Sequence, residues 1–179
     1  MREEVIIRNI KFSFRLKSAE NLQNRLKALV CSNNIKFHGN FAVLRLPYGV
    51  FSIWYGGFFN CTKQKNLQVF AKCLYKLGDL LKFNPEIDCL NIQADNISAT
   101  GKVNIPQSIL FSDLISSLNL DNALCSIRYD LNSFPGAVLK FRAGTFILFK
   151  SGKYISVGSK SPKRIKECLK QLKIELKLK

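Results

Sequence analysis

Two long segments of the chain carry apolar residues at helical spacing. The first contains Leu67, Phe70, Ala71, Leu74, Leu77 and Leu81, and the second contains Ile165, Leu169, Leu172 and Leu176. Apolar residues three and four positions apart lie on one face of an α-helix, so the pattern predicts two amphipathic helices that each cover a core. Apolar segments before each helix, interrupted at Gly56-Gly57 and at Ser151-Gly152, predict β-hairpins with glycine turns.

Two shorter elements are expected ahead of each hairpin region. We expect strands at residues 5–16 and 97–105, each followed by a short helix. The first short helix is expected to have Ser18 as its N-cap and to carry an apolar face made of Leu22, Leu26 and Leu29. In the second half, Pro106 is expected to open a helix that carries Leu110 and Leu114.

Short sequence matches indicate that this layout is an internal repeat. Asn9-Ile10 recurs as Asn96-Ile97, and the segment FAVLR at Phe41 recurs as FPGAVLK at Phe134. Further along, matched residues are separated by a constant 95 positions: Trp54 with Phe149, Gly57 with Gly152, Lys65 with Lys160, Cys73 with Cys168 and Leu77 with Leu172. The chain is therefore predicted to divide into a first repeat, residues 1–88, and a second repeat, residues 89–179.

The order of elements predicts the fold class of each repeat. A strand, a helix, several strands and a second helix give an α+β unit whose helices lie on one face of an antiparallel sheet. The other face is then uncovered. If residues 151–153 form the hairpin loop, Ile147, Phe149, Ile155 and Val157 share that uncovered face. An apolar patch of this kind usually marks an interaction site.

Composition narrows the class of protein. With 47% hydrophobic and 22% charged residues, the chain is expected to fold around a core. No apolar run reaches the roughly 20 residues of a membrane span, and MREEVIIRNI is not a signal-peptide pattern, so we expect a soluble protein of the cytosol or nucleus. The net charge of +16 indicates either a solvated basic surface or a polyanionic partner, most simply nucleic acid, with a membrane surface as the weaker option.

Residues for catalysis or metal binding are scarce. The six cysteines include no CxxC pair and His38 is the only histidine, so we expect reduced, mostly buried thiols rather than a zinc site. A single histidine, with neither a GxGxxG motif nor a P-loop, also argues against an enzyme. We therefore expect no catalysis, no cofactor and no small-molecule substrate.

Several motifs resemble the TATA-box-binding protein family. The segments FPGAVLKF and FILFKSGKYISVGSKS are similar to its second repeat, and the Asn-Ile pairs at Asn9 and Asn96 match the paired Asn-Ile with which its repeats open. NCTKQK, from Asn60, and KLG, from Lys76, match a segment and a helix end of the family. The resemblance covers nearly the whole chain and is more specific in the second repeat.

The resemblance implies a fold and a mode of binding. It implies a pseudo-symmetric α+β saddle of two TATA-binding-protein-like repeats, in which a curved antiparallel sheet carries helices on its convex face and binds the DNA minor groove with its concave face. This family is itself the standard example of minor-groove binding with inserted apolar side chains. The cost of a few kcal/mol per unstacked base step is therefore implied by the resemblance and is not predicted from the residues. The uncovered apolar face would then be covered by DNA.

Carried over residue by residue, the resemblance implies a DNA-binding set. Its wedges are Phe41, Trp54, Phe134 and Phe149, its central amides are Asn9 and Asn96, its groove-floor residues are Thr62, Ile155 and Val157, and its phosphate contacts are Arg45, Lys65, Lys140, Lys153 and Lys160. The asparagine amides can donate to the A N3 and T O2 acceptors of the minor groove. The alternatives are that the four aromatics are core residues, the asparagines turn residues and the lysines solvated.

The chain departs from the family pattern on the predicted groove floor. Lys11, Ser98 and Asn60 stand where the family has small β-branched residues, and Val157 stands at a usual threonine. A lysine on the floor would disturb a dry fit against the bases. We therefore expect a preference for TATA-type DNA that is less strict than the family's.

The leading hypothesis is a divergent general transcription factor that binds and bends A·T-rich duplex DNA and nucleates transcription initiation. The resemblance implies initiation factors and the polymerase machinery as partners, with Asp130 in the loop that contacts the bridging factor. No membrane partner is expected. The expected location is the nucleus, or the site of viral transcription if the source is a virus. The alternative is a saddle-fold adaptor or regulator that acts through protein contacts, with weak or non-specific DNA binding.

Overall fold

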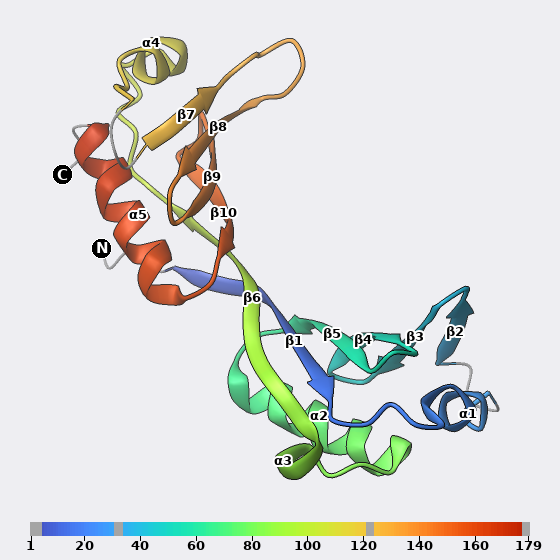
Figure 1. Ribbon diagram of the computed structural model, residues 1–179. Helices are drawn as coiled ribbons and strands as arrows, with labels where there is room; N and C mark the ends of the chain where they lie inside the picture. Colours follow the sequence, from blue (N-terminus) through green and yellow to red (C-terminus); the bar gives the residue numbers. More distant parts are fainter. Residues whose placement is uncertain (1–4, 31–33, 121–123, 177–179) are drawn as a thin grey trace. The chain divides into compact units, whose positions relative to one another are not determined.

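The computed structural model describes residues 5–30, 34–120 and 124–176, and it has the predicted α+β architecture (Figure 1). The strands are β1 (Ile6–Leu16), β2 (Ile35–His38), β3 (Phe41–Leu46), β4 (Gly49–Trp54), β5 (Phe58–Gln64), β6 (Cys89–Lys102), β7 (Leu124–Arg128), β8 (Gly136–Phe141), β9 (Gly144–Phe149) and β10 (Lys153–Ser159). The helices are α1 (Leu22–Lys27), α2 (Leu67–Leu81), α3 (Pro85–Asp88), α4 (Phe111–Ser116) and α5 (Pro162–Glu175). The hydrogen-bonded strand order is β2-β3-β4-β5-β1-β6-β10-β9-β8-β7.

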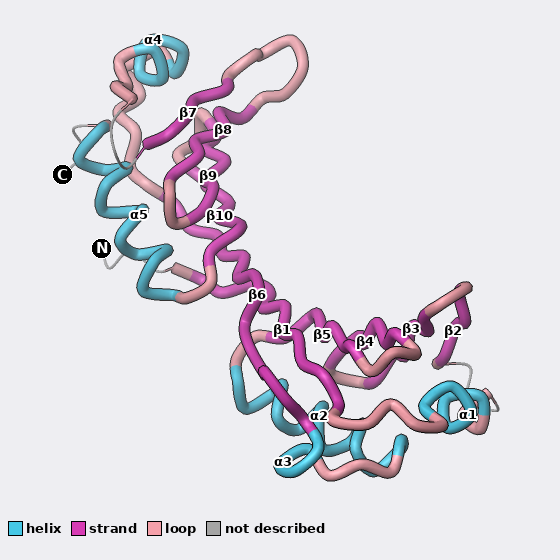
Figure 2. Tube along the Cα trace, viewed as in Figure 1, coloured by secondary structure: helices cyan, strands magenta, loops and turns pink. Residues whose placement is uncertain are grey.

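The described chain forms two compact units. The first-half unit comprises Asn9–Asp95, and the second-half unit comprises the described residues from Asn96 onward together with those before Asn9. Strands β1 and β6 therefore each contribute residues to both units. Within each unit the helices lie on one side of the strands (Figure 2), as predicted. The repeat boundary between residues 88 and 89 stays a prediction.

Helix α2 packs against the buried face of the sheet in the first-half unit. It begins at Asn66, whose Oδ1 accepts a hydrogen bond of 2.9 Å from the Val69 amide, which satisfies one of the donors at the helix start. Phe70, Leu74, Leu77 and Leu81 of its predicted stripe are buried, whereas Ala71 is half-buried. The Phe70 ring stacks on Phe12 with centroids 4.1 Å apart. Leu67 is an exception and is exposed, because a side chain at the first helical position projects back beyond the start of the helix.

Helix α5 covers the second-half unit in the same way. Ser161 caps it by accepting a 3.3 Å hydrogen bond from the Arg164 amide, and Pro162 occupies the first turn, where no amide donor is needed. The predicted stripe is confirmed, since Ile165, Leu169, Leu172 and Leu176 are all buried. These side chains belong to the same core as Phe146 and Tyr154 of the sheet, whose ring centroids lie 5.1 Å apart.

The predicted starts of the short helices are wrong. Helix α1 begins at Leu22 with Asn21 at its N-cap position, whereas Ser18 Oγ accepts from the Glu20 amide in a turn before the helix. Helix α4 begins at Phe111, five residues after Pro106. Helices this short are set by the residues they bury, here Leu22, Leu26, Phe111 and Leu114, rather than by local start signals.

The ends of some predicted elements also differ from those in the structure. Leu29 lies beyond the end of α1, and Leu110 is exposed at the N-cap position of α4. Strand β6 begins at Cys89, eight residues before its predicted start, and it lies beside β1 in the sheet. Its first residues show no alternation of buried and exposed positions, so the sequence pattern did not mark them as a strand. Strand β1 lies within one residue of its predicted bounds, and both predicted glycine-turned hairpins are present.

Cys61, Cys73, Cys89 and Cys168 are free thiols, as predicted. Cys61, Cys73 and Cys168 are buried and Cys89 is half-buried, whereas Cys125 is exposed. Cys31 lies outside the described residues. Burial, reinforced by the neighbouring Cys73, raises the pKa of the Cys61 thiol, and burial together with Asp88 raises the pKa of Cys89 to about 11.

We expect the stability of the protein to fall in alkaline solution. Thiols of the unfolded chain ionise near pH 8.5, whereas the buried Cys61 thiol stays protonated in the folded state. The contribution of Cys61 is therefore fully present below about pH 8.5 and is lost as the pH rises above it, by roughly 1–2 kcal/mol at pH 10. Urea unfolding at pH 8 and pH 10 measures the loss, and Cys61→Ala is the control. An equal loss in both proteins would contradict the assignment.

Candidate nucleic-acid interface

The hairpin of β9 and β10 exposes an apolar surface on the face turned away from α5, which we call the outer face of the second-half unit. Ile147 lies directly opposite both Val138 of β8 and Ile155 of β10, and Ile155 lies opposite Thr100 of β6. The residues between them, such as Phe146 and Leu148, are buried beneath the sheet. The predicted sharing of one face by Ile147, Phe149, Ile155 and Val157 is confirmed.

The loop of this hairpin lies one residue earlier than predicted. It comprises residues 150–152, because Gly152 has a left-handed φ of 76° and donates its amide hydrogen bond to the Phe149 carbonyl at 2.8 Å. A residue with a side chain adopts such a φ only with strain. The shift moves the pairing by two residues, so every side chain keeps the face that was predicted for it.

Phe134 and Phe149 contact each other on this outer face. Their ring centroids are 6.0 Å apart at 61°, and Phe134 is 41% exposed. Gly136 lies beneath both rings: a Cβ there would come within 2.8 Å of Phe134 and 3.1 Å of Phe149. The glycine of the FPGAVLKF segment therefore makes room for two aromatic rings that the core does not use.

Asp130 organises the loop that carries Phe134. Its main-chain oxygen accepts from the Phe134 amide at 2.9 Å, and its Oδ1 accepts from the Asn132 amide at 3.0 Å. The residue is exposed. The carboxylate thus has a role within its own loop, and its predicted contact with an initiation factor stays a prediction.

The first-half unit has a longer row of aromatic rings on its outer face, the face turned away from α2. Phe41 and Trp54 lie directly opposite each other with centroids 5.5 Å apart. His38 stacks on Phe41 at 4.8 Å, and Phe58 lies 5.4 Å from Trp54. The Arg15 guanidinium carbon lies over the Phe58 ring, 5.5 Å from its centroid, which is a cation–π contact. His38, Phe58 and Arg15 were missed from the sequence, because each is recognisable only from the strand beside it.

The two central asparagines occupy equivalent backbone sites. Asn9 Oδ1 accepts from the Lys63 amide and Asn96 Oδ1 accepts from the Gly158 amide, both at 2.7 Å. Lys63 and Gly158 have left-handed φ values of 65° and 84°, where β5 and β10 bulge. Because the oxygen of each amide faces the bulge, the opposite side of each amide group is its nitrogen, which is a hydrogen-bond donor. The two asparagines are therefore oriented alike.

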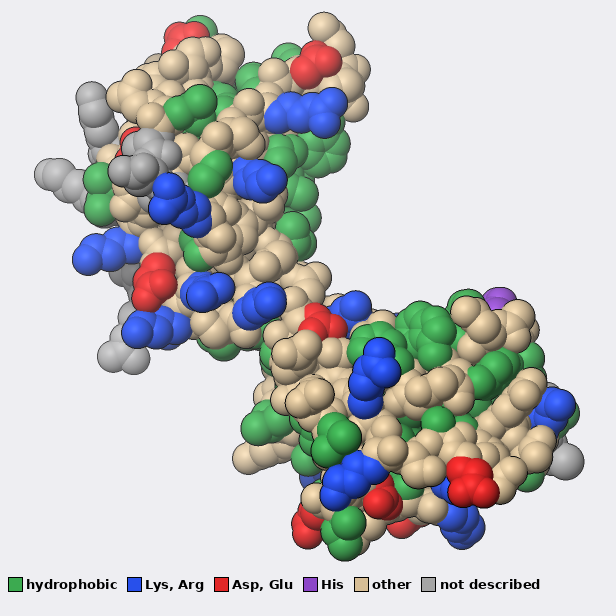
Figure 3. All heavy atoms as spheres, in the orientation of Figure 1, with side chains coloured by type: hydrophobic (Ala, Val, Ile, Leu, Met, Phe, Trp, Pro, Cys, Tyr) green, Lys and Arg blue, Asp and Glu red, His purple; other side chains and the backbone are tan. Residues whose placement is uncertain are grey.

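The predicted phosphate contacts lie at the surface. Arg45 and Lys140 are exposed on the outer faces, opposite Val50 and Thr145 respectively. The remaining candidates, Lys65, Lys153 and Lys160, are exposed at or just beyond the ends of β5 and β10. Figure 3 shows hydrophobic side chains over β3–β5 in one unit and beside β8–β10 in the other, with Lys and Arg at several places around them. Their contact with DNA stays a prediction.

The groove-floor candidates lie on the outer faces and show how the two halves differ. Thr62 lies opposite Val50, and its hydroxyl donates to the Val50 carbonyl at 3.5 Å. Val157 lies opposite Thr145, and Ile155 is 37% exposed. Asn60, in contrast, lies between Ser52 and Ser13. The floor is therefore apolar in the second-half unit and largely polar in the first.

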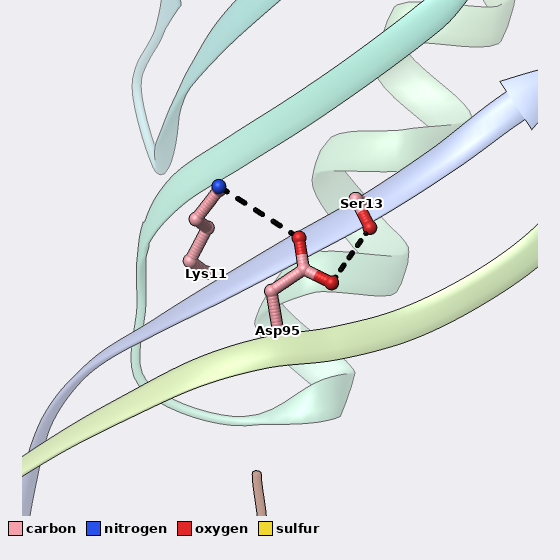
Figure 4. A network of polar contacts seen from close by, with 3 residues as sticks. All are labelled: Lys11, Ser13 and Asp95. Atoms are coloured by element: carbon pink, nitrogen blue, oxygen red, sulfur yellow. Dashed lines mark hydrogen bonds and ion pairs between the residues drawn. The ribbon is translucent and has the colours of Figure 1, made fainter. Parts of the chain in front are cut away.

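Lys11 belongs to a polar network on the outer face of the first-half unit (Figure 4). Its Nζ lies 3.8 Å from Asp95 Oδ2, and Ser13 Oγ donates a 2.9 Å hydrogen bond to Asp95 Oδ1. The side chains of Lys11 and Asp95 are 36% and 25% exposed. Asp95 was missed from the sequence, because an isolated acidic residue carries no signal of its strand partners. Ser98, a further departure from the family pattern, is partly buried.

Two features are absent from the described part of the chain. No helix there is both long and apolar enough to span a bilayer. No three His, Cys, Asp or Glu residues of these segments gather closely enough to hold a metal ion.

Comparisons with known proteins point to one family. The family model for transcription factor TFIID (or TATA-binding protein, TBP) matches residues 91–177. The TATA-box-binding protein of Thermoplasma volcanium is 30% identical over 183 residues, which cover 98% of this chain and 95% of that protein. TATA-box-binding protein 2 of Methanosarcina acetivorans is 27% identical over 190 residues, covering 98% and 96%. The solved structure of Methanococcus jannaschii TBP superposes with a TM-score of 0.74 at 22% identity, covering 97% of this chain and 98% of that one.

Proposed function

Because this chain belongs to the TATA-box-binding protein family, a family of non-enzymatic DNA-binding factors of transcription initiation, we propose that it binds and bends A·T-rich duplex DNA through the minor groove. On this proposal each unit lays its outer face against one half of the DNA site. The bent duplex then serves as the starting point for assembly of the initiation machinery.

The observation that carries the proposal is the placement of Phe134 and Phe149. Both rings lie on the outer face of the second-half unit, over a glycine, with no core role. Apolar rings in this position can enter between two base pairs and kink the duplex, at a cost of a few kcal/mol per unstacked step. Phe41 and Trp54 supply a matched pair in the first-half unit. A net charge of +16 supports the proposal, because it favours a polyanionic partner.

The supporting residues divide into two groups by their chemistry. Asn9 and Asn96 supply amide donors that suit the A N3 and T O2 acceptors of the minor groove floor. Exposed cations such as Arg45 and Lys140 supply phosphate contacts, which set the position of the protein without reading sequence. No cofactor takes part.

The protein partners follow from the same family membership. Promoter DNA and the transcription machinery are the partners that the family implies. We place the contact with a bridging initiation factor at the loop of Asp130, where the carboxylate is exposed. The basic surface of α5 is a second place where an acidic partner would dock. The relatives named above come from archaea, so the nuclear location stays a prediction.

Binding and bending of defined duplexes test this function. We expect the purified protein to bind a TATA-type duplex at least about tenfold more tightly than a G·C-rich duplex, and energy transfer between dyes at the duplex ends to report bending. Fluorescence anisotropy at two salt concentrations measures the affinities. Weak binding that ignores sequence, falls steeply with salt and leaves the duplex straight would show that charge alone acts, and the adaptor hypothesis would then replace this one.

A further inference from the structure

Equivalent positions of the two outer faces carry opposite charges. In the first-half unit Ser13 Oγ donates to the carboxylate of Asp95 at 2.9 Å, and in the second-half unit the Arg8 guanidinium donates to Thr100 Oγ1 at 2.8 Å. Ser13 and Thr100 are separated by the same 87 positions as Asn9 and Asn96, and Arg8 and Asp95 each precede one of those asparagines. A carboxylate in one half therefore stands where a guanidinium stands in the other.

The rows of cross-strand neighbours that contain Ser13 and Thr100 also differ, because the first row is polar where the second is apolar. The first-half row consists of Val43, Ser52, Asn60 and Ser13, and the second-half row consists of Val138, Ile147, Ile155 and Thr100; in both, each residue lies opposite the next on the neighbouring strand. Two isoleucines of the second-half row are thus a serine and an asparagine in the first. Asn60 Oδ1 is buried and has no hydrogen-bond partner within the described segments. The first-half row therefore contains a hydrogen-bond acceptor for which the row supplies no donor.

The minor groove of DNA presents hydrogen-bonding groups that are complementary to each of these two surfaces. Both A·T and T·A pairs present only acceptors there, whereas a G·C pair adds the N2 amino group of guanine, which is a donor. Each carboxylate oxygen of Asp95 has two lone pairs, so the carboxylate can accept another hydrogen bond beside the one from Ser13, while Lys11 forms an ion pair with it at 3.8 Å. The charge of Lys11 also offsets repulsion between the carboxylate and the phosphates. Arg8 carries only donors and suits A·T pairs.

We propose that Asp95 makes the first-half unit select a G·C pair within its half of the DNA site, while Arg8 and the apolar row make the second-half unit select A·T pairs. The protein then recognises an asymmetric element and binds it in one direction. This inference rests on the proposed function, because it requires both outer faces to meet the minor groove.

Inosine separates the amino group of guanine from its other properties. An inosine·C pair has the same major-groove oxygen and ring nitrogen as a G·C pair but lacks the N2 amino group, so its minor groove resembles that of an A·T pair. A palindromic A·T duplex is prepared with one G·C pair, or one inosine·C pair, at each position of one half in turn. Affinities are measured by anisotropy at one fixed salt concentration, because salt changes every value.

We expect the wild-type protein to bind the G·C duplex about tenfold more tightly than the inosine·C duplex at one position or more, since the hydrogen bond involves a charged acceptor. Asp95→Ala should abolish this ratio. Arg8→Ala, at the equivalent position of the other half, should leave it unchanged. A duplex with a G·C pair in each half should bind the wild type about tenfold less tightly than the duplex with one, because the second pair must face Arg8, and Arg8→Ala should reduce that penalty.

Each outcome bears on one of the two proposals. If the wild type binds inosine·C as tightly as G·C at every position, or if Asp95→Ala keeps the ratio, the inference is overturned while minor-groove binding stands. If no duplex is bound selectively or bent, the proposed function itself fails. The wild-type comparison needs no variant, so the test survives if Asp95→Ala does not fold, and circular dichroism checks the folding of both variants.

Discussion

Phe149→Ala is expected to weaken binding to a TATA-type duplex by about 10- to 100-fold while leaving the fold intact. Stacking of a base on an aromatic side chain is worth about 1–3 kcal/mol, and this ring lies on the outer face of the second-half unit, where it supports no core contact. Duplex bending should fall together with affinity, because a lost wedge leaves the base step stacked. Anisotropy and end-to-end energy transfer measure the two effects.

A neighbouring phenylalanine provides the matched control. Phe146 lies three residues earlier on the same strand, but its side chain is fully buried beneath the sheet. Phe146→Ala should therefore lower the free energy of unfolding by roughly 3–5 kcal/mol, which urea unfolding measures. Loss of stability in Phe149→Ala of the same size as in Phe146→Ala would show that Phe149 is a core residue, and the assignment of the outer face would be wrong.

Gly152→Ala is expected to lower the free energy of unfolding by about 3 kcal/mol or more. The residue has a φ of 76°, and a Cβ there would lie 2.1 Å from the Val103 carbonyl oxygen, so both backbone strain and a steric clash oppose the change. Gly152 also accepts the Val103 amide hydrogen bond at 2.9 Å and donates to Phe149. Its displacement should disturb the hairpin that carries Phe149 and Ile155. Urea unfolding and DNA binding of the same variant measure both effects.

The first repeat supplies a control for this glycine. Gly56 lies in the corresponding turn, and a Cβ there would meet nothing within 4 Å. Gly56→Ala should therefore change the free energy of unfolding by no more than about 0.5 kcal/mol. If Gly152→Ala were as mild as Gly56→Ala, the backbone of the second hairpin would be able to relax, and the tight turn would not be what holds Phe149 in place.

The predictions that the structure confirmed rest on the spacing of apolar residues within one helix or one hairpin. The stripes of α2 and α5 were predictable because helical spacing repeats over four turns, and the apolar outer face of β9 and β10 was predictable because side chains alternate along a strand. The one-residue error in the hairpin loop did no harm, since it shifted the register by two. The starts of α1 and α4 failed, because tertiary burial of residues such as Leu22 and Phe111 overrode the local signals of Ser18 and Pro106.

The candidate interface was predictable in one half and incomplete in the other. The segments FPGAVLKF and FILFKSGKYISVGSKS carry Phe134 and Phe149 with the glycine between them, and the family model likewise matches only residues 91–177. In the first-half unit, the polar residues Ser52 and Asn60 replace the apolar floor, so local matching is weaker there. His38 and Phe58 were missed because their contacts with Phe41 and Trp54 cross between strands.

The sequence by itself determined the amphipathic helices and the aromatic pairs, because the pattern for each lies within one helix or one hairpin. It also determined the two-repeat plan, because the same local patterns recur along the chain. Only the tertiary structure decided that Asp95 meets Ser13 and Lys11 while Arg8 meets Thr100. These contacts join residues of β1 and β6 that lie more than eighty positions apart in the chain, and the register between such strands is set by packing of the whole sheet. The opposite charges of the two outer faces are therefore a property of the fold.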